Sequence, residues 1–328
     1  MASIFGYQHW YGRLINLIVS SIGILFFYKL INLIFNHKVA LNAGICLLFS
    51  SWFMFSRKMM PDTYCITLMF IALWFCLQYL INKKGLLLLG YICFATLAVL
   101  SKIPAGIYFV LLIPLLFSRK ISLKPKIIIS IATLIPLMTT YYWYFIWNVH
   151  LSDMYGTWYN LGMSLKDGFY DISAHVSQVL NNFYFNSFVG FSFFILSIWG
   201  LFCSIKNKNK ILLTIVSSVF AIFVVHVFKS GFFFYHHNYY IIPFVPILAL
   251  LAGYGLSFIK RQALYIPILT FCIFESVINQ QHDFVLPDRE KYKLQLPILA
   301  DQTSHLNDKI VINGNDNPQM LYLSHRKG

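Results

Sequence analysis

Long apolar runs dominate the chain and recur along most of its length. A helix needs about 20 apolar residues to cross a bilayer core about 30 Å thick. Runs of near that length, bounded by charged residues or by Pro, Gly and Asn, are predicted to form ten transmembrane helices at 14–35, 39–55, 63–82, 86–101, 103–118, 127–147, 188–205, 211–228, 239–259 and 263–280. The pattern therefore predicts an α-helical polytopic membrane protein with about ten transmembrane helices.

Two segments interrupt this pattern. In residues 148–187, apolar side chains recur at helical spacing among polar ones, which predicts an external amphipathic helix in the membrane interface, at Ile172, Val176, Val179, Leu180 and Phe183. Residues 281–328 are more polar: 309–314 are typical of a strand and turn, and 315–318 of a loop. We therefore predict a transmembrane domain, 1–280, and an extracytoplasmic α/β tail, 281–328, that is truncated.

Composition agrees with a membrane protein. The 328 residues are 59% hydrophobic and 11% charged, with a mean hydropathy of +0.68. Soluble domains carry about 25% charged residues, so a soluble class is excluded. The formal charge of +14 does not indicate a nucleic-acid partner, because the basic residues form short clusters between apolar runs. All six cysteines lie within apolar runs, so no disulfide is predicted.

The basic clusters predict the topology. When successive loops are placed alternately on the two sides of the membrane, one side carries a group of Lys and Arg residues and no acidic residue. These residues are Lys38, Lys83, Lys84, Arg119, Lys120, Lys124, Lys126, Lys206, Lys208, Lys210, Lys260 and Arg261. This side is predicted to be cytoplasmic by the positive-inside rule. We therefore expect an integral protein of a bacterial inner membrane with both termini and the site outside. An outside N-terminus suggests that a preceding span is absent from this chain.

The first candidate site lies in the loop Ser56–Asp62. Arg57 and Lys58 could hold a phosphate, and the Asp62 carboxylate could orient a metal, a hydroxyl or a sugar. Alternatively, Pro61 ends the loop and Asp62 caps the next helix. Spacing alone leaves both interpretations open.

Two further candidates lie on the same predicted side. Lys102 stands alone between two apolar spans, where it could meet a lipid phosphate or extend to the interface as an anchor. Near the ninth span, ammonium, imidazole and phenol groups could bind phosphate or a metal, or form an interfacial aromatic belt, at Lys229, His236, His237, Tyr239 and Tyr240. Adjacent histidines cannot both face one way on a helix. Glu275 is either a structural partner or a site group.

Several of these segments together resemble a known family. They are Arg13–Leu17 opening a span, the Ser-Arg-x-x-x-Pro-Asp loop of 56–62, the Leu100–Ala105 junction, His237–Pro243 with Pro246, and the closing Asn317–Tyr322. In this order they resemble the bacterial dolichyl-phosphate-mannose-protein mannosyltransferase type of the GT-C superfamily. That superfamily includes the aminoarabinose transferases that modify lipid A.

The resemblance implies an inverting transfer of a sugar from a polyprenyl-phosphate donor to a lipid, glycan or protein acceptor at the outer face. It implies that Arg57 and Asp62 shape the sugar and phosphate site, with Asp62 as the catalytic carboxylate. Lys102 would face the donor phosphate, and His237 and Tyr239 would line the lipid-phosphate side.

The sequence departs from the family pattern at its start. The family carries a catalytic acid pair in its first external loop, but no Asp or Glu precedes Leu14. We therefore interpret the chain as incomplete at both ends, and its activity alone is left open. A transporter or flippase of a lipid-linked saccharide is the alternative function. No cofactor is assigned. A divalent metal at Asp62 with His236 or His237 is left open, because that ligand set is incomplete.

Overall fold

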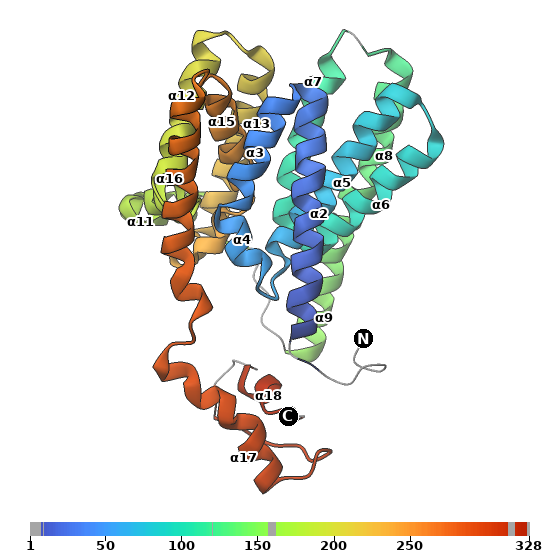
Figure 1. Ribbon diagram of the computed structural model, residues 1–328. Coiled ribbons are helices and arrows are strands. Elements are labelled where there is room, and N and C mark those ends of the chain that lie inside the picture. The colour runs from blue at the N-terminus through green and yellow to red at the C-terminus, as the bar shows by residue number, and fades with distance from the viewer. Residues whose placement is uncertain (1–7, 9, 120, 157–161, 314–318, 327–328) are drawn as a thin grey trace. The chain divides into compact units, whose positions relative to one another are not determined.

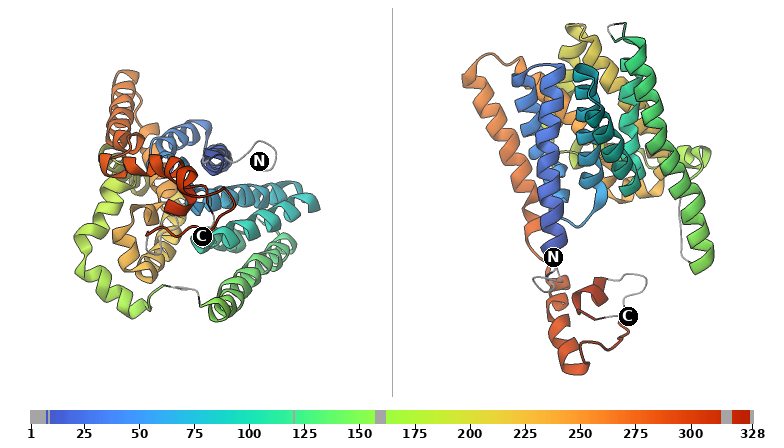
Figure 2. Two further views of the ribbon diagram at one scale, coloured as in Figure 1. Left: turned by 90° about the horizontal axis from the view of Figure 1, so that it is seen from below. Right: turned by 90° about the vertical axis from the view of Figure 1, so that its right-hand side faces the viewer.

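The computed structural model describes residues 8, 10–119, 121–156, 162–313 and 319–326. It divides into two compact units, one of Gly12–Asn279 and one of Met1–Tyr11 with Gln280–Gly328. In the larger unit, long helices run alongside one another (Figures 1 and 2).

Helical structure lies at each of the ten predicted spans. The elements are α2 (Trp10–Ile34), α3 (His37–Leu48) with α4 (Ser51–Ser56), α5 (Pro61–Asn82), α6 (Gly85–Ser101), η1 (Ile103–Leu111) with α7 (Leu112–Phe117), α8 (Leu123–Tyr141) with η2 (Tyr142–Trp147) and α9 (Asn148–Tyr155), α12 (Ser192–Lys206), α13 (Lys210–Ser230), η4 (Asn238–Ile241) with α15 (Val245–Ser257), and α16 (Gln262–Gln280). In the described residues, five helical segments are long and apolar enough to cross a membrane, and five more are apolar but shorter. The predicted α-helical membrane fold is confirmed.

The sixth span is longer than predicted. Its helix does not end at Trp147 but continues through α9 to Tyr155. Gly156 follows with a φ of +63°, the left-handed conformation that commonly terminates a helix. Residues 148–155 therefore extend this helix and do not belong to a separate interfacial one.

The rest of the segment 148–187 contains α10 (Leu165–Ala174), α11 (Val176–Asn181) and η3 (Asn182–Asn186). Ile172 and Val179 are buried, as the amphipathic pattern predicts. Val176 and Leu180 are 49% and 50% exposed, so the buried face is narrower than expected. The reason is that α10 ends at Ala174 and α11 begins at Val176, and the non-helical backbone of His175 between them interrupts the helical spacing.

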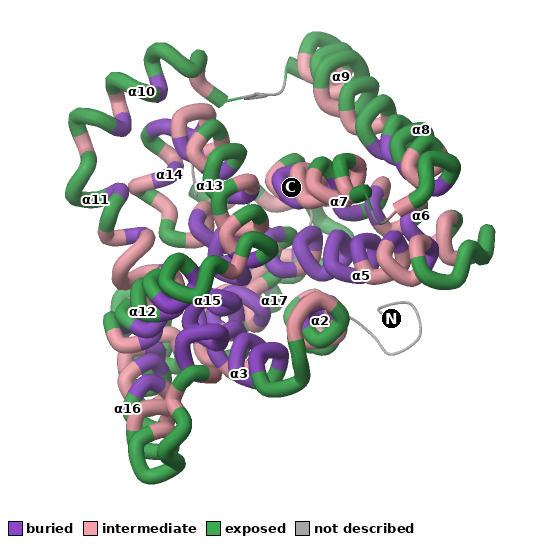
Figure 3. The backbone as a smooth tube through the Cα atoms, turned by 90° about the horizontal axis from the view of Figure 1, so that it is seen from above, coloured by how far each residue is buried: buried purple, intermediate pink, exposed green. Residues whose placement is uncertain are grey.

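Most residues of α3, α5 and α15 are buried, and these helices lie inside the larger unit (Figure 3). Every residue of α15 from Val245 to Leu256 is buried. Glycines permit the close packing on both sides of this helix, because a Cβ on Gly200 would lie 1.8 Å from the Leu251 carbonyl oxygen and one on Gly253 2.3 Å from the Ala43 nitrogen. Small residues of this kind let membrane helices approach closely.

Glu275 has a structural position. Its carboxylate on α16 accepts hydrogen bonds from the backbone N–H groups of Phe191 (3.0 Å) and Ser192 (2.9 Å), and from the Ser192 hydroxyl. These donors lie at the start of α12, so Glu275 satisfies N–H groups that a helix leaves unpaired. Of the two interpretations of Glu275, the structure supports the structural partner.

The smaller unit contains η5 (Gln281–Phe284), η6 (Asp288–Gln295), α17 (Leu296–Thr303) and α18 (Gln319–Leu323). The buried Arg326 guanidinium, which follows α18, links this helix to α17. It donates to the Asp301 carboxylate at 2.7 Å and to the Ser304 hydroxyl at 3.1 Å. The strand predicted at 309–314 is not found in the described residues, where only Lys309 forms a single bridge and no ladder extends from it. The predicted α/β character is therefore not seen; Gly314 and the loop 315–318 lie outside the described residues.

Candidate functional site

An ion pair between Asp62 and Lys102 lies at the centre of the candidate site. Lys102 Nζ is 2.5 Å from Asp62 Oδ1, and the two side chains are 26% and 3% exposed. The second carboxylate oxygen, Oδ2, is buried and has no hydrogen-bond partner among the described residues. The pair therefore keeps one acceptor position unfilled.

Local sequence explains how the two side chains meet. Pro61 is the first residue of α5, which places Asp62 in its first turn, where a negative charge is favourable. α6 ends at Ser101, and its C-cap Lys102 has an extended backbone two residues before Pro104, a position after the cap where proline commonly follows a helix. Because α5 and α6 pack against each other, this break lies beside the start of α5. The N-cap of α5 is Met60, so the interpretation of Asp62 as the cap is not supported.

Two tyrosines from η4 confine the ammonium group. Lys102 Nζ lies 5.1 Å from the ring centroid of Tyr239 and 5.4 Å from that of Tyr240. The two rings are 5.0 Å apart and inclined by 30°. An ammonium within about 6 Å of an aromatic ring is attracted to its electron-rich face. The structure thus brings together four predicted site residues, Asp62, Lys102, Tyr239 and Tyr240.

Asn16, which was not among the predicted site residues, anchors the loop before Asp62. The Asn16 side chain on α2 donates to the carbonyl oxygens of Lys58 (2.7 Å) and Phe55 (3.3 Å). One turn further along, the Ser20 hydroxyl donates to the Thr63 hydroxyl at 2.7 Å. An asparagine inside an apolar run was the available signal, because polar groups in a membrane need partners.

The basic residues of the loop lie against aromatic rings. The Arg57 guanidinium carbon is 5.1 Å from the ring centroid of Phe53, and Lys58 Nζ is 4.7 Å from that of Phe55. Lys229 lies in the last turn of α13, where its carbonyl oxygen accepts a hydrogen bond from the Met163 N–H at 2.8 Å.

The two adjacent histidines make different contacts. The exposed His236 stacks on Phe232 with ring centroids 3.7 Å apart. His237 is half-buried and stacks on Tyr239 at 5.2 Å. Burial, together with the charges of His236 and Lys102, lowers the pKa of His237, which favours its neutral form at pH 7.

The structure gives no support for the divalent metal. The described part of the chain contains no group of three His, Cys, Asp or Glu side chains that could hold a metal ion. The Asp62 carboxylate pairs with Lys102, and the histidines stack on aromatic rings.

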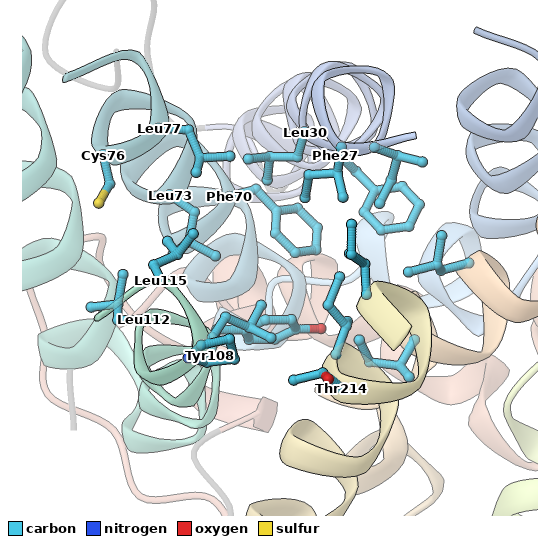
Figure 4. A pocket seen from close by; sticks show the side chains of 18 of the residues that line it. Phe27, Leu30, Phe70, Leu73, Cys76, Leu77, Tyr108, Leu112, Leu115 and Thr214 are labelled. Atoms are coloured by element: carbon cyan, nitrogen blue, oxygen red, sulfur yellow. The ribbon is translucent and has the colours of Figure 1, made fainter. Parts of the chain in front are cut away.

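An apolar cavity of about 470 Å³ is lined in part by α5, the helix that carries Asp62, and by η1, which begins directly after Lys102 (Figure 4). It is lined from α2, α5, η1, α7, α13 and α15, by side chains that include Phe27, Leu30, Phe70, Leu73, Tyr108 and Leu112. Phe70 follows Asp62 by eight residues on α5, which corresponds to about 12 Å along the helix. A second hollow, of about 390 Å³, lies beside Pro61 and Ser101 and includes Asn16 and Tyr64.

Comparison with known proteins finds a family model that matches part of the chain. Residues 1–144 match the dolichyl-phosphate-mannose-protein mannosyltransferase family. The matched region contains both Asp62 and Lys102. The resemblance inferred from the sequence motifs is confirmed. No protein of curated function shows significant sequence similarity to the chain.

A solved structure shares the fold. The crystal structure of ArnT from Cupriavidus metallidurans bound to undecaprenyl phosphate is similar with a TM-score of 0.52 and 16% sequence identity, over 98% of this chain and 57% of that one. The structure of the same ArnT in the apo state gives 0.48 and 15%, over 98% and 55%. The present chain thus spans a little over half the length of ArnT.

Proposed function

We propose that the chain is the membrane part of a glycosyltransferase that moves a sugar from a polyprenyl-phosphate donor to an acceptor on the extracytoplasmic face. The observation that carries the proposal is the Asp62–Lys102 pair, with a buried carboxylate and an ammonium beside Tyr239 and Tyr240, at the starts of α5 and η1, which also line the apolar cavity. An ammonium with an apolar cavity about 12 Å further along α5 suits a ligand that joins a phosphate to an isoprenoid chain. The family match and the fold shared with ArnT support it.

The geometry suggests how the transfer proceeds. A donor phosphate oxygen replaces the Asp62 carboxylate at Lys102, which frees both oxygens of Asp62. The oxygen of the acceptor hydroxyl then attacks the anomeric carbon from the face opposite the phosphate, so the configuration is inverted, and the hydroxyl proton passes to solvent water. The bond between that carbon and the phosphate oxygen breaks, and its electron pair leaves with the polyprenyl phosphate. Lys102 stabilises this leaving group, and Asp62 stabilises the positive charge that develops on the sugar.

The remaining predicted site residues have supporting roles in this proposal. Arg57 and Lys58 lie on the loop before Asp62, where they would bind the charged parts of donor or acceptor. Lys229, His236 and His237 would extend this surface, with the neutral His237 able to donate or accept a hydrogen bond. The hollow beside Pro61 and Ser101 gives room for a sugar or an acceptor. Residues 281–328 would begin an external domain.

Binding to a lipid phosphate tests the proposal. The purified 328-residue chain in lipid nanodiscs should bind undecaprenyl phosphate at least about tenfold more tightly than undecaprenol, which has the same chain without the phosphate. Microscale thermophoresis with each lipid would measure both affinities. Equal affinities would contradict the proposal. Accelerated movement of a fluorescent undecaprenyl phosphate across reconstituted vesicles would support the flippase alternative instead.

Sidedness gives a separate prediction. Single cysteines in place of Leu165, Ser122 and Asn207, all exposed positions, are introduced after the native cysteines have been replaced. In intact cells, an impermeant maleimide should label position 165 and not 122 or 207, because Lys and Arg hold the loops of the latter two inside. All three should react after lysis. Labelling at 207 but not at 165 in intact cells would place the site in the cytoplasm.

A further inference from the structure

His226 lies in α13, one turn before that helix ends, and sequence reasoning did not select it. Its ring is nearly parallel to that of Tyr240, with centroids 6.0 Å apart and an angle of 14°. The Ser230 hydroxyl lies 3.5 Å from Nδ1, and the Tyr240 main chain also contacts the imidazole. The other ring nitrogen, Nε2, is buried and has no partner that meets hydrogen-bond geometry among the described residues.

His226 belongs to the surroundings of Lys102. Both side chains contact Tyr240, and the ammonium is close enough to act electrostatically on the imidazole. The neighbourhood of this one ammonium thus holds two polar atoms without partners, Asp62 Oδ2 and His226 Nε2. Buried polar atoms without partners cost free energy, so an acceptor oxygen beside His226 Nε2 and a hydroxyl donor beside Asp62 Oδ2 would both stabilise the site.

The charges indicate what that ligand requires of His226. The charges of Asp62 and Lys102 cancel within the pair, so a phosphate that arrives at Lys102 gains from additional hydrogen-bond donors beside it. A second permanent cation would repel Lys102 strongly in an apolar environment. An imidazole avoids this repulsion, because in its neutral form it still offers one N–H donor.

We propose that His226 is a second ligand of the donor phosphate, whose Nε2–H donates to a phosphate oxygen held by Lys102. The inference rests on the proposed function, which places the phosphate at Lys102. It adds a binding residue from α13, a helix outside the family match over residues 1–144.

Matched variants test this assignment. His226→Gln keeps an N–H donor near the position of Nε2, whereas His226→Phe keeps only the flat ring against Tyr240. In nanodiscs, we expect His226→Phe to weaken undecaprenyl phosphate binding about tenfold and His226→Gln to stay within about threefold of the parent. Neither variant should change binding of undecaprenol. Equal undecaprenyl phosphate affinities for His226→Phe and the parent would overturn the proposal.

Two additional measurements keep the test decisive. The ¹⁵N resonance of His226 Nε2, assigned through its loss in His226→Gln, should shift when undecaprenyl phosphate is added and not when undecaprenol is added. An unchanged resonance would overturn the assignment even if His226→Phe failed to fold. Lys102→Ala serves as the reference: normal phosphate-lipid binding in that variant would contradict the proposed function itself, whereas loss there with no effect of His226→Phe contradicts only the role of His226.

Discussion

Replacing Lys102 with Met is expected to lower the affinity for undecaprenyl phosphate by about ten- to a hundredfold, the range of a charge-assisted hydrogen bond. Met keeps the length and the apolar stem of the side chain, so the loss is that of the charge. Asp62→Asn should leave the affinity for undecaprenyl phosphate unchanged or raise it, because the substitution removes the carboxylate that competes with the phosphate for Lys102 at 2.5 Å. Lipid titrations of both variants in nanodiscs would measure the two effects.

The same variants should differ in stability. Lys102→Met leaves the Asp62 carboxylate, which is 3% exposed, without its partner. Removing one member of a buried pair typically costs about 3 to 5 kcal/mol in the free energy of unfolding, because the other charge stays buried. The double variant Asp62→Asn, Lys102→Met should recover most of that loss but not the affinity. Recovery of affinity in the double variant would show that Lys102 acts on the fold and not on the phosphate.

The helices could be predicted from the sequence because the bilayer imposes a length and a polarity on each span. All ten predicted runs contain helix, and the errors lie where the bilayer gives no signal. The helix after Trp147 runs on to Tyr155 because no residue interrupts it before Gly156. Residues 309–314 have a strand-like composition, but a strand forms only by pairing, which composition does not record.

The candidate site was predictable by residue but not by contact. Asp62 and Lys102 stood out because charges are rare in these runs, yet their pairing depends on how α5 and α6 are rotated against each other. Asn16 and His226 lie inside apolar runs and carry no charge pattern, so nothing in the sequence linked them to Lys58 or Tyr240. The sequence signal for both was the cost of a polar group in a membrane.

Replacing Gly200 with Ala is expected to destabilise the protein more than the addition of one methyl group usually does. The added Cβ would lie 1.8 Å from the carbonyl oxygen of Leu251 and 3.1 Å from the nitrogen of Gly255, both main-chain atoms of α15. Backbone atoms cannot rotate away as a side chain can, so α12 and α15 must separate. Overpacking of this kind costs about 3 kcal/mol. The thermal midpoint of the detergent-solubilised protein should fall by about 5 to 10 °C.

Gly44 provides the matched control, because it is also a buried helical glycine but a Cβ there would meet no atom within 4 Å. Gly44→Ala should keep or raise the thermal midpoint, since Ala favours helix over Gly by about 1 kcal/mol. The Gly200 effect should also reach the site: α15 follows η4, which holds Tyr239 and Tyr240 against Lys102. Folded Gly200→Ala protein should therefore bind undecaprenyl phosphate more weakly than Gly44→Ala protein. Equal thermal midpoints in the two variants would mean that α12 and α15 do not pack through Gly200 in the folded protein.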